Sequence, residues 1–293
     1  MTVCIAAIAN SGRAIVLASD RMISTEQFSA DSAIYKIRGI HHDWAALCSA
    51  SSTDHIYPIL RETRTVLSKD KAPKSRQDVA RALICAYQAR HLTVQNDKVL
   101  SPYGMDRKAF FRKGPRGLGD SFFQRVALKL EQVNLGCRFL VAGYDRTFAP
   151  HVFLVQHPGE EVDRTYPGFW ATGSGATSAL SVLFFYSPTI TDSLERVLYC
   201  VCAAKFMAET APGVGKDTSV VILETFIDEA KFKAENPDAC ISLRVRELPL
   251  PAVNDLRKLW KRGMLRIPGN ITDKVAAVLR GTEPASLGPV VGT

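Results

Sequence analysis

The sequence predicts an α+β fold in which β-sheets pack on one another and helices lie outside them. Its predicted elements come in the order strands, two helices, strands, two helices and strand, which is typical of this class. The 293 residues fit one large domain with an appendage, or two small domains. Hydrophobic residues make up 46% and charged residues 23% of the chain, as in an average globular protein. This composition excludes a wholly disordered chain, a collagen and a simple coiled coil.

The first part of the chain predicts strands. Residues 2–9 are mostly apolar, residues 10–13 carry a turn signal, and residues 14–19 are apolar again before Asp20. These two runs predict a β-hairpin. Further extended segments are expected at about 33–39 and at 44–49.

Two helices are expected next. Ser52 or Thr53 opens the first, whose apolar residues recur on one side. Ser75 and Asp78 have the spacing of a capping box, which predicts the start of the second helix.

Residues 96–128 are rich in glycine and basic residues, interleaved with Phe110, Phe111, Phe122 and Phe123. We expect an inserted loop whose aromatic side chains anchor it to the body of the domain. Basic and aromatic residues together also suggest nucleic-acid binding. The stretch has no recognised binding motif, however, and the net charge of +8 permits polyanion contact without requiring it. Nucleic acid is therefore not expected as a partner.

The second half predicts strands at 137–143, 151–156 and 169–172, helices at 174–186 and up to 209, and a strand at 218–224. Asp192 and Glu195 have the spacing of a cap for the second of these helices. Residues 225–293 are more charged, with one helix expected at about 252–262. The apolar residues of that helix are Leu256, Leu259 and Trp260. They would contact either a neighbouring subunit or the rest of their own subunit. We therefore expect a domain over 2–224 and a C-terminal extension over 225–293.

No apolar stretch approaches the roughly 18 residues of a membrane span, and the first residues lack the features of a secretory signal. The seven cysteines include no Cys-x-x-Cys pair, and no His or Cys spacing is typical of a metal site. We expect a cytoplasmic protein that has no membrane contact, no metal and no cofactor.

The residue after the initiator methionine is Thr2. Its small side chain favours removal of Met1, which would leave Thr2 with a hydroxyl and a free α-amine. An α-amine has a pKa of about 7.7–8.0, so it can take the proton of a neighbouring hydroxyl and activate it as a nucleophile.

Asp20 and Lys36 are candidate partners of this nucleophile. Thr2 and Asp20 are eighteen positions apart across the predicted hairpin, and this even spacing allows their side chains to share a face. A lysine beside Thr2 would lower the pKa of its hydroxyl, and Asp20 would keep that lysine charged and oriented. Spacing alone leaves a surface Asp–Lys pair without chemistry as the alternative.

The chain resembles the proteasome-type N-terminal-nucleophile (Ntn) hydrolases, and among them a bacterial proteasome β-subunit-like protein. The resemblance runs through residues 2–224 and is carried by these stretches: Thr2-Val-Cys-Ile, Val16 to Arg21, Tyr35-Lys36-Ile37, Asp54, Leu140 to Asp145, Pro158-Gly159 and Ala171 to Gly175. It implies a four-layer αββα sandwich over 2–224, with 96–128 as an insert and 225–293 as an extension.

The resemblance also implies roles for single residues. Thr2 matches the nucleophile, Asp20 and Lys36 match its polar partners, and Ser174 matches a serine that helps to relay protons. Ala50 stands where the family usually has a glycine whose backbone N–H stabilises the oxyanion. The backbone of Ser24 would bind the substrate in extended form. The side-chain pocket would be lined by Ile23 and Cys48, with a medium-sized apolar preference.

Three departures distinguish the chain from the family pattern. The hairpin between Thr2 and Asp20 is two residues longer than usual, and the insert and the extension are atypical. Near the end of the last helix Glu209 stands for an expected Asp, while Pro212 cannot replace an expected Ser hydroxyl. Residues 213–218 superficially resemble a phosphate loop, but they lack its spacing.

The resemblance implies a threonine-type amidohydrolase, expected to be a peptidase of a self-compartmentalising ring. Its substrates would be peptides or unfolded proteins, its assembly a homo-oligomeric ring, and an ATPase a candidate partner. The rival hypothesis is a catalytically inactive structural or assembly subunit, which the missing Ser hydroxyl at Pro212 favours.

Overall fold

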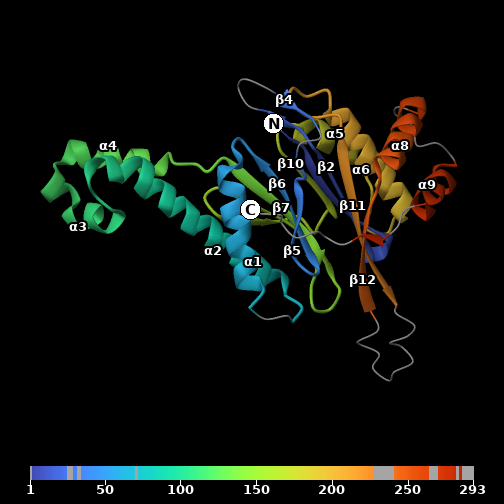
Figure 1. Ribbon diagram of the computed structural model, residues 1–293, viewed down its shortest axis with the longest axis horizontal. Coiled ribbons are helices and arrows are strands. Elements are labelled where there is room, and N and C mark those ends of the chain that lie inside the picture. Colours follow the sequence, from blue (N-terminus) through green and yellow to red (C-terminus); the bar gives the residue numbers. More distant parts are fainter. Residues whose placement is uncertain are drawn as a thin grey trace.

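The computed structural model describes residues 2–24, 29–31, 34–69, 72–227, 241–263, 270–281 and 284–285, and these form an α+β fold (Figure 1). Within this described part, two large antiparallel sheets have the strand orders β10-β1-β2-β11-β12-β13 and β5-β6-β7-β8-β9. The first contains β1 (Cys4–Ala9), β2 (Ala14–Asp20), β10 (Phe169–Thr172), β11 (Thr218–Ile227), β12 (Ile241–Glu247) and β13 (Pro284–Ala285). The second contains β5 (Ile37–His41), β6 (Trp44–Ala50), β7 (Cys137–Tyr144), β8 (Pro150–Gln156) and β9 (Glu160–Asp163).

The predicted N-terminal hairpin is confirmed, since β1 pairs with β2 and Cys4 lies opposite Ser19. Alternate residues of β1 belong to two different apolar clusters. Ala6 and Ile8 pack toward the second sheet, whereas Ile5 and Ala7 pack toward helices. Both faces of β1 are therefore buried, which explains why its sequence is a continuous apolar run.

Helices cover the outer face of each sheet. Helices α1 (Ile56–Leu67) and α2 (Arg76–Gln95) pack on the five-stranded sheet. The other sheet is covered by α5 (Ala176–Tyr186), α6 (Leu194–Ala208), α8 (Leu250–Gly263) and α9 (Ile271–Arg280).

Capping residues were expected at the starts of the helices now labelled α2 and α6. The capping box of Ser75 and Asp78 is confirmed at the start of α2. The cap expected from Asp192 is wrong, because the Ser193 side chain accepts the Arg196 N–H. The Asp192 carboxylate accepts the Thr189 N–H instead, at 2.7 Å.

The loop expected over 96–128 is wrong. Helices α3 (Arg107–Leu118), kinked at Gly114, and α4 (Asp120–Glu131) fill most of this segment, after short turns at Asn96–Leu100 and Ser101–Tyr103. In Figure 1 both helices project from the far end of α2, away from the sheets. Their aromatic residues pack on one another rather than on the body, and the rings of Phe110 and Phe123 stack at 4.7 Å.

The C-terminal extension is joined to the first sheet, because β12 pairs with β11. The predicted helix appears as α8, and its Leu256 is fully buried against the apolar cluster that contains α6. The ring of Trp260 lies 5.6 Å from that of Phe206 on α6. The apolar face of α8 thus packs on its own subunit, so of the two expected contacts the intrasubunit one is found.

No helix in the described residues is both long enough and apolar enough to cross a membrane. The same residues contain no cluster of His, Cys, Asp and Glu side chains that could hold a metal ion.

Candidate active site

Thr2, Asp20 and Lys36 meet in one buried site. The Thr2 hydroxyl donates to Asp20 Oδ1 at 2.9 Å. Lys36 Nζ donates to Thr2 Oγ1 and to both oxygens of Asp20, at 2.9 and 2.8 Å. The exposed fractions are 3% for Thr2, 0% for Asp20 and 9% for Lys36. The Thr2 hydroxyl is therefore a buried candidate nucleophile that contacts a cation and a carboxylate directly.

Thr2 and Asp20 meet for a different reason from the shared face that their spacing allowed. The register places Asp20 opposite Val3, and Asp20 N–H donates to Val3 O at 3.2 Å. Strict alternation would therefore put Thr2 and Asp20 on opposite faces. They meet because Thr2 precedes β1, beyond the end of the ladder, and the Asp20 carboxylate accepts the Val3 N–H at 2.9 Å.

Ser174 lies at the backbone of Thr2, between β10 and α5. Its Oγ accepts the Thr2 N–H at 2.9 Å, and its hydroxyl donates to Thr2 O at 3.3 Å. Gly173 makes this approach feasible, because a Cβ at this position, where φ is +102°, would lie 2.3 Å from Thr2 O. Ser174 thus stands next to the nitrogen that would become the α-amine.

Two cavities within the described structure border Thr2, with volumes of about 410 and about 590 Å³. Thr2, Ala50 and Ser51 line both of them. The smaller cavity is also lined by Ile23 and Cys48, the two residues expected in the side-chain pocket. Ser174 lines the larger cavity. A peptide that occupied both cavities would therefore pass beside Thr2.

The backbone of β6 and of β3 (Ile23–Ser24) borders this region. Cys48 N–H donates to Lys36 O at 3.0 Å, and Ala50 is two residues further along β6, so its N–H points toward the same edge. Strand β5 begins at Ile37, so the pairing of β5 with β6 ends before it reaches Ala50. Ser24 follows Ile23 in β3 and pairs with Ser29 of β4 (Ser29–Ala30).

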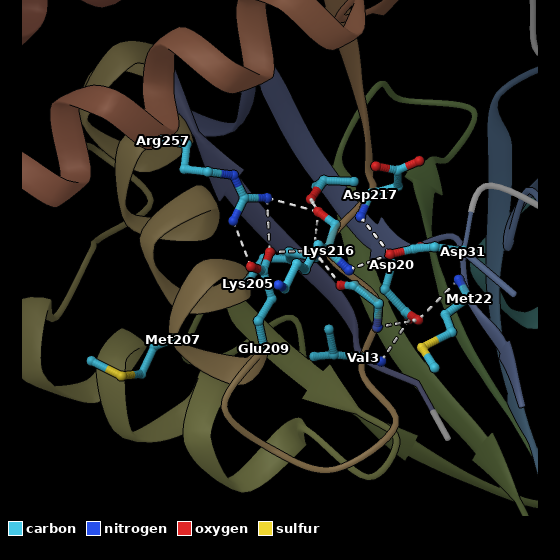
Figure 2. Close-up of polar contacts among 12 residues, drawn as sticks. Val3, Asp20, Met22, Asp31, Lys205, Met207, Glu209, Lys216, Asp217 and Arg257 are labelled. Atoms are coloured by element: carbon cyan, nitrogen blue, oxygen red, sulfur yellow. Dashed lines mark hydrogen bonds and ion pairs between the residues drawn. The ribbon is translucent and has the colours of Figure 1, made fainter. Parts of the chain in front are cut away.

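A further set of contacts holds Asp20 from the side of α6 (Figure 2). Its Oδ2 accepts the N–H groups of Met22 and Gly215, each at 3.2 Å. Gly215 belongs to the segment that resembled a phosphate loop in the sequence. Its structural role is to donate a backbone hydrogen bond to the carboxylate beside Thr2.

Glu209, the expected distal support, reaches this segment through Lys205. The Lys205 ammonium is fully buried and donates to Glu209 Oε1 at 2.5 Å, to Gly215 O at 2.8 Å and to Lys216 O at 3.1 Å. Burial lowers the pKa of Lys205, and the Glu209 carboxylate opposes that shift. Arg257 on α8 donates to both oxygens of Glu209 and to Lys216 O.

Sequence reasoning missed Lys205, Gly215 and Arg257. A lysine inside the apolar run of α6, four residues before Glu209, was the available signal, because lysine is rarely buried without a partner. Arg257 lies 48 residues from Glu209 and gave no local signal.

The thiols beside the site are poor nucleophiles. Burial raises the pKa of Cys48 to about 12 and raises that of Cys4 well above its ordinary value. Both thiols are therefore protonated near neutral pH, and the thiolate is the reactive form of cysteine. The Thr2 hydroxyl is the group that the geometry favours for attack.

Neither the protein-family models nor the curated proteins compared with the chain match it.

Proposed function

We propose that this chain is a threonine-type amidohydrolase, specifically a peptidase, in which Thr2 acts as an N-terminal nucleophile after removal of Met1. The observation that carries the proposal is the contact of Thr2 Oγ1 with Lys36 and Asp20 between two cavities. A hydroxyl beside a charge that lowers its pKa, with a base on the same residue, is the arrangement of an activated nucleophile.

In the proposed reaction, the hydroxyl proton of Thr2 passes to the freed α-amine of the same residue, and Ser174, 2.9 Å from that nitrogen, helps to transfer it. Thr2 Oγ1 then forms a bond to the substrate carbonyl carbon. Lys36 stabilises negative charge on Oγ1 as the bond forms. The Ala50 N–H would hold the oxyanion, an interaction that contributes about 3–4 kcal/mol in enzymes that use it.

Collapse of the tetrahedral intermediate breaks the C–N bond, and the leaving amine takes the proton that the Thr2 amine had received. The acyl group remains on Oγ1 as an ester. Water, deprotonated by the same amine, then attacks the ester. The C–Oγ1 bond breaks, the acid leaves, and the amine returns the proton to Oγ1. Each step uses groups of this chain and water alone.

The proposal extends to fold type, assembly and location. The layers described above, with apolar clusters between the sheets and under the helices on each side, support a four-layer αββα sandwich of the Ntn-hydrolase type. We propose a cytoplasmic homo-oligomeric ring that degrades peptides or unfolded proteins, with an ATPase as a candidate partner. Exposed apolar side chains on α5, Phe184 and Phe185, at 53% and 64%, support a further contact between copies.

The decisive experiment compares the parent with Thr2→Ala on a fluorogenic peptide amide, with Thr65→Ala as the control. Thr65 is an exposed threonine of α1 whose hydroxyl donates to Arg61 O. We expect Thr2→Ala to lower kcat by at least about 10³-fold and Thr65→Ala to leave it unchanged. A parent that cleaves nothing would support the inactive assembly subunit, and equal rates for parent and Thr2→Ala would refute the nucleophile.

A further inference from the structure

We infer that the smaller cavity beside Thr2 selects an acidic side chain, glutamate or aspartate, on the residue whose carbonyl is attacked. This inference rests on the proposed function, since it names the substrate that Thr2 would cleave. The observation that carries it is the presence of Arg38 in the lining of that cavity, together with Thr2 and Cys48.

The strand register explains how Arg38 reaches the cavity. Arg38 lies opposite Ala46 in the pairing of β5 with β6, and Cys48 N–H donates to Lys36 O. Because alternate residues of a strand share a face, Lys36, Arg38 and Cys48 lie on one face of the sheet. The charge of Arg38 acts on the Cys48 thiol, where it partly offsets the rise in pKa that burial causes. The cation is thus close to the residue expected to line the pocket.

The charge of Arg38 has no counter-ion in the described structure. Lys36 is paired with Asp20, but no carboxylate of the described residues lies within ion-pair distance of Arg38. Its contacts are a hydrogen bond to Tyr57 Oη at 3.3 Å and a position 5.7 Å from the centre of the Tyr57 ring. Partial burial removes water from the Arg38 guanidinium, and no anion compensates for that loss. The carboxylate of a bound substrate side chain would do so by accepting charged hydrogen bonds.

The other residues of the cavity fit a glutamate side chain. Ile23, Ile34 and Ile56 line it and would contact the methylene groups, while the carboxylate accepts hydrogen bonds from the guanidinium. Asp54 also borders the cavity and would repel an acid. Its side chain is exposed, however, so solvent and salt screen its charge more than that of the half-buried Arg38. The purely apolar preference expected from Ile23 and Cys48 therefore changes to an acidic one.

The test uses peptide amides that differ only in the residue before the scissile bond: Glu, Gln, Leu or Lys. Glutamine has the shape of glutamate without its charge. We expect kcat/KM for the Glu peptide to exceed that for the Gln peptide by at least about tenfold. Arg38→Ala should abolish this ratio, and Arg38→Glu should invert the preference toward Lys. Arg61→Glu, the same charge change at an exposed position of α1, should keep the parent ratio.

A second measurement separates this inference from the proposed function. Binding of the same peptides to Thr2→Ala is measured by calorimetry, alone and combined with Arg38→Glu. If the parent cleaves Glu and Gln peptides equally well, the inference is wrong while the function stands. If the parent cleaves nothing but the Glu peptide binds more tightly through Arg38, the function fails while the inference stands. Equal binding of Glu and Gln peptides refutes the acidic pocket.

Discussion

Arg257, in the C-terminal extension, donates hydrogen bonds to both carboxylate oxygens of Glu209. Figure 2 shows the line of contacts that begins there and passes through Lys205 and the Lys216 segment to Asp20. The extension thereby holds the loop whose Gly215 N–H reaches the carboxylate beside Thr2. A segment outside the domain expected over 2–224 is therefore connected by these contacts to Asp20.

Arg257→Ala should weaken both stability and turnover. It removes charged hydrogen bonds to Glu209 and Lys216 O, so the free energy of unfolding should fall by about 2 kcal/mol. We expect a lower kcat with little change in KM, because the loop positions Asp20 and not the substrate. Denaturant unfolding and steady-state kinetics measure the two effects.

Lys258→Ala is the matched control for that variant. Lys258 is the next residue of α8 and forms a surface pair with Asp255, so its removal should change the free energy of unfolding by less than about 0.5 kcal/mol. Arg257→Lys should restore part of the lost turnover. Equal stability and kcat for Arg257→Ala and Lys258→Ala would disprove the positioning role.

Lys205 should give stability a specific pH dependence. Burial lowers its pKa in the folded protein below the ordinary 10.5, so between the lowered value and 10.5 the unfolded chain binds more protons than the folded chain. Stability contributed by this residue therefore rises with pH across that window and is constant below it. The free energy of unfolding of the parent minus that of Lys205→Met should increase toward pH 10.5. A pH-independent difference would show that Lys205 titrates normally.

Thiol alkylation should leave turnover intact. The Cys48 thiol has a pKa raised to about 12 by burial and is 4% exposed, so iodoacetamide at pH 8 should not modify it. The exposed Cys85 provides the positive control for the reagent. Peptide mapping and residual activity are measured together, and loss of activity that tracks modification of Cys48 would indicate a cysteine nucleophile.

Lys36 and Ser174 should differ in their effects on turnover. Lys36→Ala removes the charge beside Thr2 Oγ1 and should lower kcat by at least about 10³-fold. Ser174→Ala removes only the proposed proton relay, which water can replace, so we expect a loss of about 10–100-fold. Thermal unfolding of each variant checks that the fold is kept. A larger loss for Ser174→Ala than for Lys36→Ala would reverse the proposed roles.

The sequence predicted the elements that depend on local signals. The β1–β2 hairpin follows from two apolar runs around a turn, and the start of α2 follows from Ser75 and Asp78. Strand β12 was missed although Ile241, Leu243 and Val245 alternate with polar residues, a period-two signal that the charged surroundings concealed. Helix α3 was missed because Gly114 and Pro115 interrupt its periodicity.

For the site, the sequence predicted the residues better than their geometry. Thr2, Asp20, Lys36 and Ser174 do meet. Thr2 and Asp20 meet beyond the end of the ladder and not on the shared face that their spacing allowed, because register depends on pairing that spacing alone does not determine. Arg257 holds Glu209 across 48 residues of sequence, a contact for which one sequence holds no local signal.

In the proposed mechanism, Thr2 is the free N-terminal residue and carries the acyl group. The most direct test is mass spectrometry of the N-terminal peptide from protein quenched in acid during turnover of a slowly hydrolysed peptide ester. We expect a peptide that begins at Thr2 and carries the acyl group on Thr2. An active protein that retains Met1, or an acyl group on another residue, would contradict the proposed mechanism.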